Sequence, residues 1–164
     1  GSNKYDVLDY FLKKHNPSNF FDLRKDLHSN FNNNLINTYS NKDNLKLIHP
    51  SIPYLFNDIR KNNVKICLNT GYPKDIQESI IGSLNMEEFI DDYISSEEVK
   101  FGRPYPYMIH QLMERNEIIN SKQVIKIGDT PNDILEGLNA NCYQSIGVLS
   151  GSTDREKLLK SGKM

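Results

Sequence analysis

Two aspartates four residues apart, Asp129 and Asp133, are the first feature of this sequence that could do chemistry. They lie in the segment GDTPND (residues 128–133), between an apolar run typical of a strand and a helical pattern. Carboxylates that converge at such a turn suit a hard divalent cation such as Mg²⁺. A helix N-cap with an acidic first turn explains the same residues equally well. On this segment alone, both interpretations stay open.

Thr70 and Gly71 end a second apolar run, residues 64–69. A hydroxyl and exposed backbone N–H groups at the end of a strand are good donors for a phosphate oxygen. An ordinary strand-ending turn uses the same residue types, and taken by themselves these two residues favour that simpler interpretation.

Arg103 lies in the segment GRPYPYM (residues 102–108), which holds two prolines two positions apart. The prolines stiffen the backbone, and Pro104 suits the start of a helix. A guanidinium that is held in one place can neutralise charge on a transferring phosphoryl group. The alternative is a surface arginine beside a helix cap.

The elements that must position these residues follow from hydrophobic periodicity. Predicted strands cover residues 64–69, 92–95, 124–127 and 143–148, and the helices that follow them cover residues 74–84, 104–115, 131–140 and 154–160. This alternation predicts βαβ units on a parallel sheet. In such sheets ligands bind beyond the carboxyl ends of the strands, and both Thr70 and Asp129 lie at such ends.

The first part of the chain predicts helices without strands. Apolar residues repeat at intervals of three and four from Tyr5 to Leu12 and again from Phe20 to Leu35. Residues 41–44 (NKDN) form a polar break, and a third helix is predicted after Pro50.

Composition narrows the classes of function. The formal net charge of -1 gives no electrostatic reason to expect a nucleic acid or an anionic membrane surface as partner. No apolar run is long enough to span a bilayer. The two cysteines, Cys67 and Cys142, do not make a disulfide framework, so we predict reduced thiols in a cytoplasmic protein.

Together, the three motifs resemble those of a known family. Residues 66–72, the GRPYPYM segment and residues 128–140 (GDTPNDILEGLNA) resemble, in order and spacing, the second, third and fourth motifs of haloacid-dehalogenase-like hydrolases. The third motif is similar to the form found in phosphonoacetaldehyde hydrolase and its phosphonatase-like relatives. The resemblance implies a Rossmannoid three-layer α/β core with a parallel sheet at residues 46–164, and a small helical cap at residues 1–45.

The family resemblance also implies an activity, which is Mg²⁺-dependent cleavage of a small phosphate ester or phosphonate through an aspartyl-phosphate. Carried over by position, Thr70 and Gly71 would bind the phosphoryl group. Arg103 would balance the charge of the phosphate and the nucleophile. Asp129 would ligate Mg²⁺, and Asp133 would hold its waters or orient neighbouring groups.

The family nucleophile lies at the end of a first strand, ahead of the cap, and no such strand-plus-aspartate motif precedes Lys4. In the family this strand lies between the strands that end here at Thr70 and Asp129. Without it, two rows of backbone donors and acceptors would be unpaired, so we expect the parent protein to supply it. The alternative is a catalytically inactive fragment of such a hydrolase, or a relative that binds a phosphorylated ligand or a partner protein.

Lys4 lies in a segment, residues 1–6 (GSNKYD), that resembles the start of the phosphonatase cap, where a lysine forms a Schiff base with the substrate aldehyde. An amine that is buried or close to other cations can act as such a nucleophile. A solvated lysine is the simpler interpretation, and the function then reduces to hydrolysis of a phosphate monoester. The identity of the substrate and the presence of a homodimer are left open.

Overall fold

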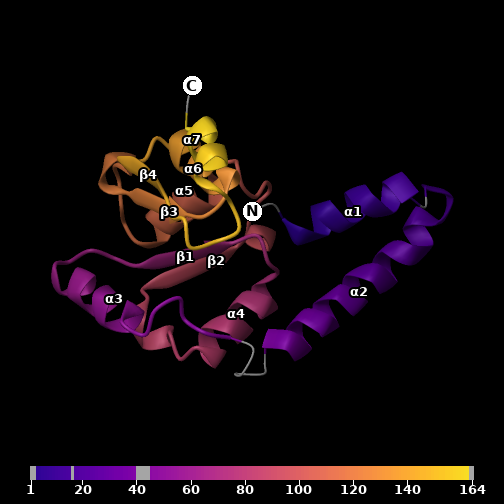
Figure 1. Ribbon diagram of the computed structural model, residues 1–164, viewed down its shortest axis with the longest axis horizontal. Coiled ribbons are helices and arrows are strands. Elements are labelled where there is room, and N and C mark those ends of the chain that lie inside the picture. Colours follow the sequence, from indigo (N-terminus) through magenta and orange to yellow (C-terminus); the bar gives the residue numbers. More distant parts are fainter. Residues whose placement is uncertain (1–2, 16, 40–44, 163–164) are drawn as a thin grey trace. The chain divides into compact units, whose positions relative to one another are not determined.

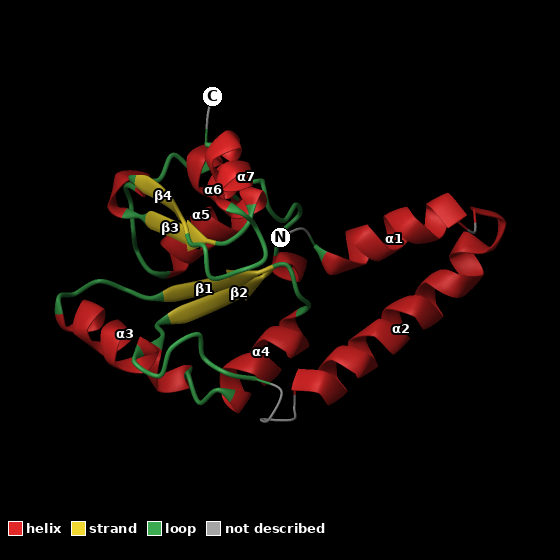
Figure 2. Cartoon of the chain, in the orientation of Figure 1, coloured by secondary structure: helices red, strands yellow, loops and turns green. Residues whose placement is uncertain are grey.

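The structure, a computed structural model, describes residues 3–15, 17–39 and 45–162, which form two compact units. The first unit comprises Cys67–Gly71 and the chain from Asp92 onward. The second unit comprises Asn3–Ile66 and Tyr72–Asp91. Figure 1 labels the helices and strands in chain order, and Figure 2 separates them by type.

The first unit contains the described strands, which form two parallel pairs. β1 (Cys67–Thr70) pairs with β2 (Asp92–Ser95), and β3 (Ile125–Gly128) pairs with β4 (Gln144–Gly147). The predicted parallel arrangement is therefore confirmed. Within the described residues no backbone ladder joins β1 to β3, and the further strand between them stays a prediction.

Three helices pack on these strands. They are α5 (Tyr107–Arg115), α6 (Pro131–Asn139) and α7 (Arg155–Ser161). α5 buries Met108 and Leu112 against Ile94 of β2, and its Ile109 packs with the buried Ala140 and Cys142. α6 lies on β3 and β4, and α7 packs against α6. α5 thus contributes to both apolar clusters of the unit, so it helps to hold the carboxyl ends of the strands in place.

The four predicted strands and the helices that follow them are all present, with some ends moved. β1 begins at Cys67, and Val64, at the start of the predicted run, is 52% exposed. α5 begins at Tyr107 because Pro104 and Pro106 lack the backbone N–H that a helix interior requires, and Pro106 becomes its N-cap residue.

The second unit is helical. Its helices are α1 (Lys4–His15), α2 (Phe20–Tyr39), α3 (Ile52–Lys61) and α4 (Lys74–Ser83), with short 3-10 turns at Pro17–Asn19 and Glu87–Phe89. Asp9 joins α1 to α2 through an ion pair with Arg24 at 2.9 Å and a hydrogen bond with Nε2 of His28 at 2.7 Å. The helices predicted before residue 40 are confirmed, whereas the polar break at residues 41–44 lies outside the described residues. The division into a cap (1–45) and a core (46–164) stays a prediction.

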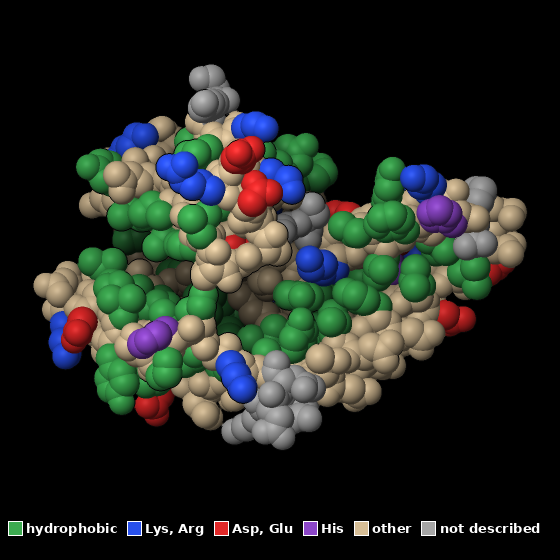
Figure 3. Space-filling view, viewed as in Figure 1, with side chains coloured by type: hydrophobic (Ala, Val, Ile, Leu, Met, Phe, Trp, Pro, Cys, Tyr) green, Lys and Arg blue, Asp and Glu red, His purple; other side chains and the backbone are tan. Residues whose placement is uncertain are grey.

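The surface of the described residues carries charged side chains of both signs and scattered apolar side chains. No described helix has the length and apolar composition that crossing a membrane requires. On the face shown in Figure 3, basic and acidic side chains are interspersed. Phe21, Tyr54 and Ile119 are each more than 70% exposed, but scattered apolar side chains are common on protein surfaces.

Gly137 allows α6 to approach its strands closely. A Cβ atom at this position would lie 2.5 Å from Oγ of Ser145 and 2.7 Å from Cβ of Lys126. We therefore expect Gly137→Ala to lower the free energy of unfolding by about 1–3 kcal/mol, as overpacking usually does. Gly82→Ala in α4 is the matched control, since its Cβ would meet only the end of the Glu87 side chain, at 3.2 Å. Urea unfolding compares the two variants, and equal stabilities would contradict the prediction.

Candidate functional site

The GDTPND segment forms the turn from β3 into α6. Thr130 is the N-cap residue, and its hydroxyl oxygen accepts a hydrogen bond from the backbone N–H of Asp133 at 3.4 Å. The Asp133 carboxylate accepts in return from the backbone N–H of Thr130 at 3.2 Å and from its hydroxyl at 2.6 Å. Pro131 is the first helical residue, where its missing N–H costs nothing. This capping box fixes the direction of the Asp133 side chain.

Asp133 is 2% exposed, and its other carboxylate oxygen, Oδ1, pairs with two cations. Arg103 donates to Oδ1 from its guanidinium, and Nζ of Lys126 lies 3.0 Å from the same oxygen. Burial by itself would raise the pKa of this carboxyl. The charges of Lys126 and Arg103, with the hydrogen bond from Thr130, outweigh burial and hold the pKa of Asp133 well below its usual range. With partners on both oxygens, Asp133 is arranged to orient Arg103.

Asp129 lies directly after β3 and is only partly buried. Its Oδ2 accepts a hydrogen bond from the backbone N–H of Ser152 at 3.1 Å. Gly151 makes this contact possible, because a Cβ atom at that position would lie 2.0 Å from Oδ2. Among the described residues, none donates a hydrogen bond to the other oxygen, Oδ1. Asp129 therefore presents a carboxylate oxygen that is available to a ligand.

The donor chemistry at Asp129 fits Mg²⁺. This ion commonly takes one or two protein carboxylates and completes its octahedral shell with water and phosphate oxygens. Within the described part of the chain there is no group of three His, Cys, Asp or Glu side chains that could hold a metal. Asp129 is the residue whose oxygen is free for such an ion, whereas Asp133 is engaged by cations of the protein.

Thr70 is the last residue of β1, and the buried Gly71 follows it. In the parallel register Thr70 lies opposite Ser95 of β2. The neighbouring Asn69 points toward α6, where its side-chain nitrogen donates to both carboxylate oxygens of Glu136 at 3.0 and 2.9 Å. The phosphate-binding residues predicted from the sequence thus lie at the carboxyl end of a strand, as expected.

The predicted site residues are divided between the two units. Arg103 and Asp133 are in direct contact in the first unit, which also holds Thr70, Gly71 and Asp129.

Lys4 belongs to the second unit, where it is the first residue of α1. Its Nζ lies 5.1 Å from the centroid of the Tyr72 ring. The Tyr72 hydroxyl is 3.1 Å from that of Tyr39, and burial, reinforced by this hydrogen bond, raises the pKa of Tyr72 to about 12. The roles assigned to the site residues from the sequence stay predictions.

Sequence reasoning missed three polar residues that surround Asp133 and Asn69. They are Thr130, Lys126 and Glu136. The available signals were a lysine inside the apolar run 124–127 and a serine-or-threonine cap three residues before an acidic residue. Neither pattern predicts that the lysine is buried.

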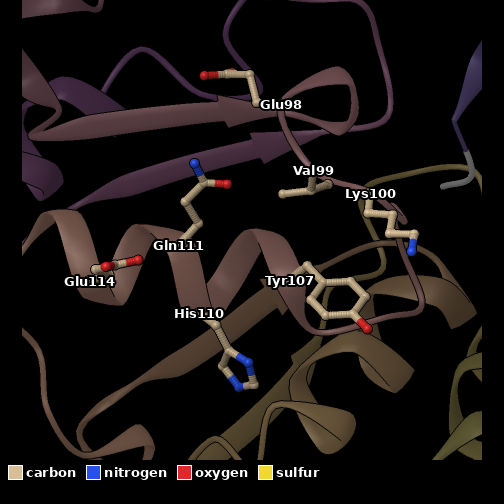
Figure 4. Close-up of a pocket in the computed structure, with 7 residues that line it drawn as sticks. All are labelled: Glu98, Val99, Lys100, Tyr107, His110, Gln111 and Glu114. Carbon is tan, nitrogen blue, oxygen red and sulfur yellow. The ribbon is translucent and has the colours of Figure 1, made fainter.

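A pocket of about 340 Å³ lies elsewhere in the first unit. Helix α5 supplies Tyr107, His110, Gln111 and Glu114, and the segment after β2 supplies residues 98–100 (Figure 4). None of the site residues predicted from the sequence lines it, and most of its side chains are exposed. The pocket is therefore not formed by the strand ends at Thr70 and Asp129.

Comparison with known proteins decides the family. Residues 1–148 match the family model described as haloacid dehalogenase-like hydrolase. The chain belongs to the haloacid dehalogenase-like hydrolase family.

The curated relatives of this haloacid dehalogenase-like chain include phosphonoacetaldehyde hydrolases. It is 36% identical over 97 residues to the enzyme of Parabacteroides distasonis, which covers 58% of this chain and 36% of that protein. It is 35% identical over 106 residues to the enzyme of Syntrophobacter fumaroxidans, with 64% of this chain and 36% of that protein covered. The chain matches about a third of the length of these relatives.

Solved structures agree on the fold. A phosphonoacetaldehyde hydrolase-like protein from Oleispira antarctica superposes with a TM-score of 0.76 at 22% identity, covering 95% of this chain and 60% of that one. A predicted phosphoglycolate phosphatase from Haemophilus somnus gives 0.72 at 16% identity, covering 98% and 71%. At these identities the likeness shows the shared fold, and the predicted family and fold class are confirmed.

Proposed function

We propose that this chain is part of a Mg²⁺-dependent phosphohydrolase of the phosphonatase-like branch, which cleaves a small phosphate ester or phosphonate through an aspartyl-phosphate. The observation that carries the proposal is the buried pair between Arg103 and Asp133, in the unit whose strands end at Thr70 and Asp129. A guanidinium oriented in advance stabilises developing charge without reorganising during the reaction. The phosphonoacetaldehyde hydrolases among the relatives support the choice of branch.

Each residue has a physical task in this proposal. The Thr70 hydroxyl and the Gly71 N–H donate hydrogen bonds to phosphoryl oxygens, and Arg103 balances their negative charge. Asp129 would hold Mg²⁺, which when bound polarises the phosphoryl group and neutralises charge. Asp133 keeps Arg103 in one orientation and would reach the ion only through its waters.

We further propose that a strand carrying the nucleophilic aspartate pairs between β1 and β3. In the described part of the chain these two strands share no backbone ladder, although Asn69 of β1 and Lys126 of β3 meet through their side chains at 2.6 Å. An inserted parallel strand would satisfy the backbone groups on both edges. Its carboxyl end would bring an aspartate to the edge where Thr70 and Asp129 lie.

The test is phosphate release by the full-length protein from a panel of phosphate esters and from phosphonoacetaldehyde, with Mg²⁺ and with a chelator. We expect release that requires Mg²⁺. Intact-mass analysis and sequencing of the same sample show whether it contains a further strand-like segment that ends in an aspartate. A protein that contains such a strand and releases no phosphate would contradict the proposal and favour a non-catalytic protein that binds a phosphorylated ligand.

The proposed partner is a small phosphorylated or phosphonate substrate, in a cytoplasmic protein that binds neither nucleic acid nor membrane. A homodimer remains an open prediction. Light scattering on the purified full-length protein measures its oligomeric state.

Lys4→Arg separates the two chemistries within the proposal. Arginine keeps the positive charge and the contact with the Tyr72 ring, but a guanidinium does not form a Schiff base. We expect phosphonoacetaldehyde turnover to fall by about 10²-fold or more, whereas ester hydrolysis changes by less than about 3-fold. Lys13→Arg is the matched control, because Nζ of Lys13 lies 4.8 Å from the centroid of the Phe20 ring. Equal losses of both activities in Lys4→Arg would count against the Schiff base.

A further inference from the structure

Lys126 is a buried lysine whose ammonium group meets acceptors from two parts of the first unit. Its Nζ lies 2.6 Å from Oδ1 of Asn69 on β1, and 3.0 Å from both Oδ1 of Asp133 and Oε2 of Glu136 on α6. The side chain of Lys126 is 9% exposed. A lysine ammonium has three hydrogens, so these three acceptors use its full donor capacity.

Glu136 completes a buried polar cluster that also contains Asn69, Arg103, Lys126 and Asp133. Its side chain is fully buried, and its two oxygens accept from Asn69 and pair with Lys126. Arg103 and Lys126 supply two positive charges, and Asp133 and Glu136 supply two negative charges. The buried cluster is therefore balanced in charge.

A cluster of this kind is a poor way to gain stability. Moving charged groups out of water is costly, and well-packed apolar side chains of similar volume often serve stability equally well or better. What such a cluster provides is a fixed orientation of its side chains, because each charged group has only one arrangement in which all its partners are satisfied. The cluster therefore matters for the orientation of its side chains more than for stability.

The cluster connects the parts of the proposed site. Asn69 precedes Thr70, and Lys126 lies three residues before Asp129 on β3. Asp133 holds Arg103, whose Nε is buried and has no hydrogen-bond partner. The direction of the Arg103 guanidinium therefore depends on Asp133. Lys126 also donates a hydrogen bond to Asn69, so one ammonium group contacts both the residue that orients Arg103 and the residue before Thr70.

We propose that Lys126 is a positioning residue of the phosphate site, which sets the direction of Arg103 through Asp133 and holds Asn69, the residue before Thr70, through a direct hydrogen bond. Glu136 holds the Lys126 ammonium in place for both contacts. The expected effect of Lys126 on catalysis rests on the proposed phosphohydrolase function. Its expected effect on the position of Arg103 does not.

The test uses the full-length protein with four variants. Lys126→Met leaves an uncompensated buried charge and is expected to lower the unfolding temperature. Lys126→Met/Glu136→Gln removes one charge of each sign, which leaves Arg103 and Asp133 as a balanced pair, so it is expected to fold. Lys126→Arg keeps the charge. Lys122→Met is the matched control, because Lys122 donates to the exposed Asn141 at 2.7 Å, outside the cluster.

We expect the double variant to lose about 10–100-fold in kcat for ester hydrolysis, as is usual when partners behind a site are removed. The affinity for inorganic phosphate, measured by calorimetry, should fall about 10-fold. Lys126→Arg should lose less of both quantities than the double variant does, and Lys122→Met should change neither. A folded double variant with the kcat and phosphate affinity of the wild type would overturn the inference, since a purely structural lysine would affect only the unfolding temperature.

The role of Lys126 can be tested even if the protein is not a phosphohydrolase. If the wild-type protein binds phosphate but hydrolyses no ester, the phosphate affinities alone decide the role of Lys126. If it does neither, crystal structures of the wild type and the double variant decide it. A displaced Arg103 or Asn69 side chain in the variant would support the inference, and an unchanged Arg103–Asp133 pair with an unmoved Asn69 would overturn it.

Discussion

Asp129→Asn is expected to reduce Mg²⁺-dependent phosphate release by about 10³-fold, because a bound cation supplies several kcal/mol of charge stabilisation. The side chain is partly buried, and its one described hydrogen bond, from the N–H of Ser152, can also be accepted by an asparagine oxygen. The free energy of unfolding should therefore change by less than about 0.5 kcal/mol. Steady-state kinetics over a range of Mg²⁺ concentrations, with calorimetric titration of Mg²⁺, measures the effect.

The control for this variant is Asp154→Asn in the same unit. Asp154 caps α7 by accepting from the N–H of Lys157 at 2.9 Å, and asparagine is an equally good N-cap residue. Its turnover should match that of the wild type. If Asp129→Asn keeps its turnover and its Mg²⁺ affinity, the carboxylate at the end of β3 is not the metal ligand.

Asp133→Asn is expected to lower the free energy of unfolding by about 3–5 kcal/mol at pH 7, because it leaves buried cations without their anionic partner. The cations are Arg103 and Lys126, and after the substitution Glu136 is their remaining buried counter-ion. Asparagine has nearly the same shape as aspartate, so the loss reports charge and hydrogen bonding more than packing. Urea unfolding of both proteins gives the difference.

The pH dependence of this difference has a definite sign. The pKa of Asp133 is lower in the folded protein than the unfolded value of about 3.9, because the charges of Lys126 and Arg103 outweigh the effect of burial. Its stabilising contribution is therefore fully present above about pH 5 and is lost as the pH falls toward the folded-state pKa. The gap between wild type and Asp133→Asn should be constant from about pH 5 to 7 and about 1 kcal/mol smaller at pH 3.

The exposed pair Asp58–Lys61 provides the control for this series. Asp58 is 71% exposed and lies 3.0 Å from Lys61, so Asp58→Asn should change the free energy of unfolding by less than about 0.5 kcal/mol at every pH. A gap for Asp133→Asn that stays the same between pH 7 and pH 3 would show that its carboxyl has an ordinary pKa in the folded protein.

Local sequence was enough to predict the order of helices and strands. Alternation of apolar runs with helical repeats identified the four described strands, and the polar GDTPND segment after the third of them marked the start of α6. These signals are local, because capping hydrogen bonds and the fixed dihedral of proline act within one turn of the backbone. For the same reason Asp129 and Thr70 could be placed at strand ends from the sequence, and the capping role of Asp133 could be stated as an alternative.

Local patterns were weaker at deciding burial. Ile125 and Ile127 are 50% and 58% exposed, whereas Lys126 between them is 8% exposed, the reverse of what hydrophobicity alone predicts for β3. Alternation along a strand says that neighbouring side chains point to opposite faces, but it does not say which face the rest of the protein covers. Here α6 covers the face that carries Lys126.

The charged cluster could be found only in the tertiary structure. Asn69 and Glu136 are 67 positions apart in the sequence, and Asn69 and Lys126 are 57 apart. No local propensity encodes contacts over such separations, because they depend on how β1, β3 and α6 pack together. Sequence motifs thus placed the predicted site residues at strand ends, whereas the packing of β1, β3 and α6 determined which polar side chains are buried beside them.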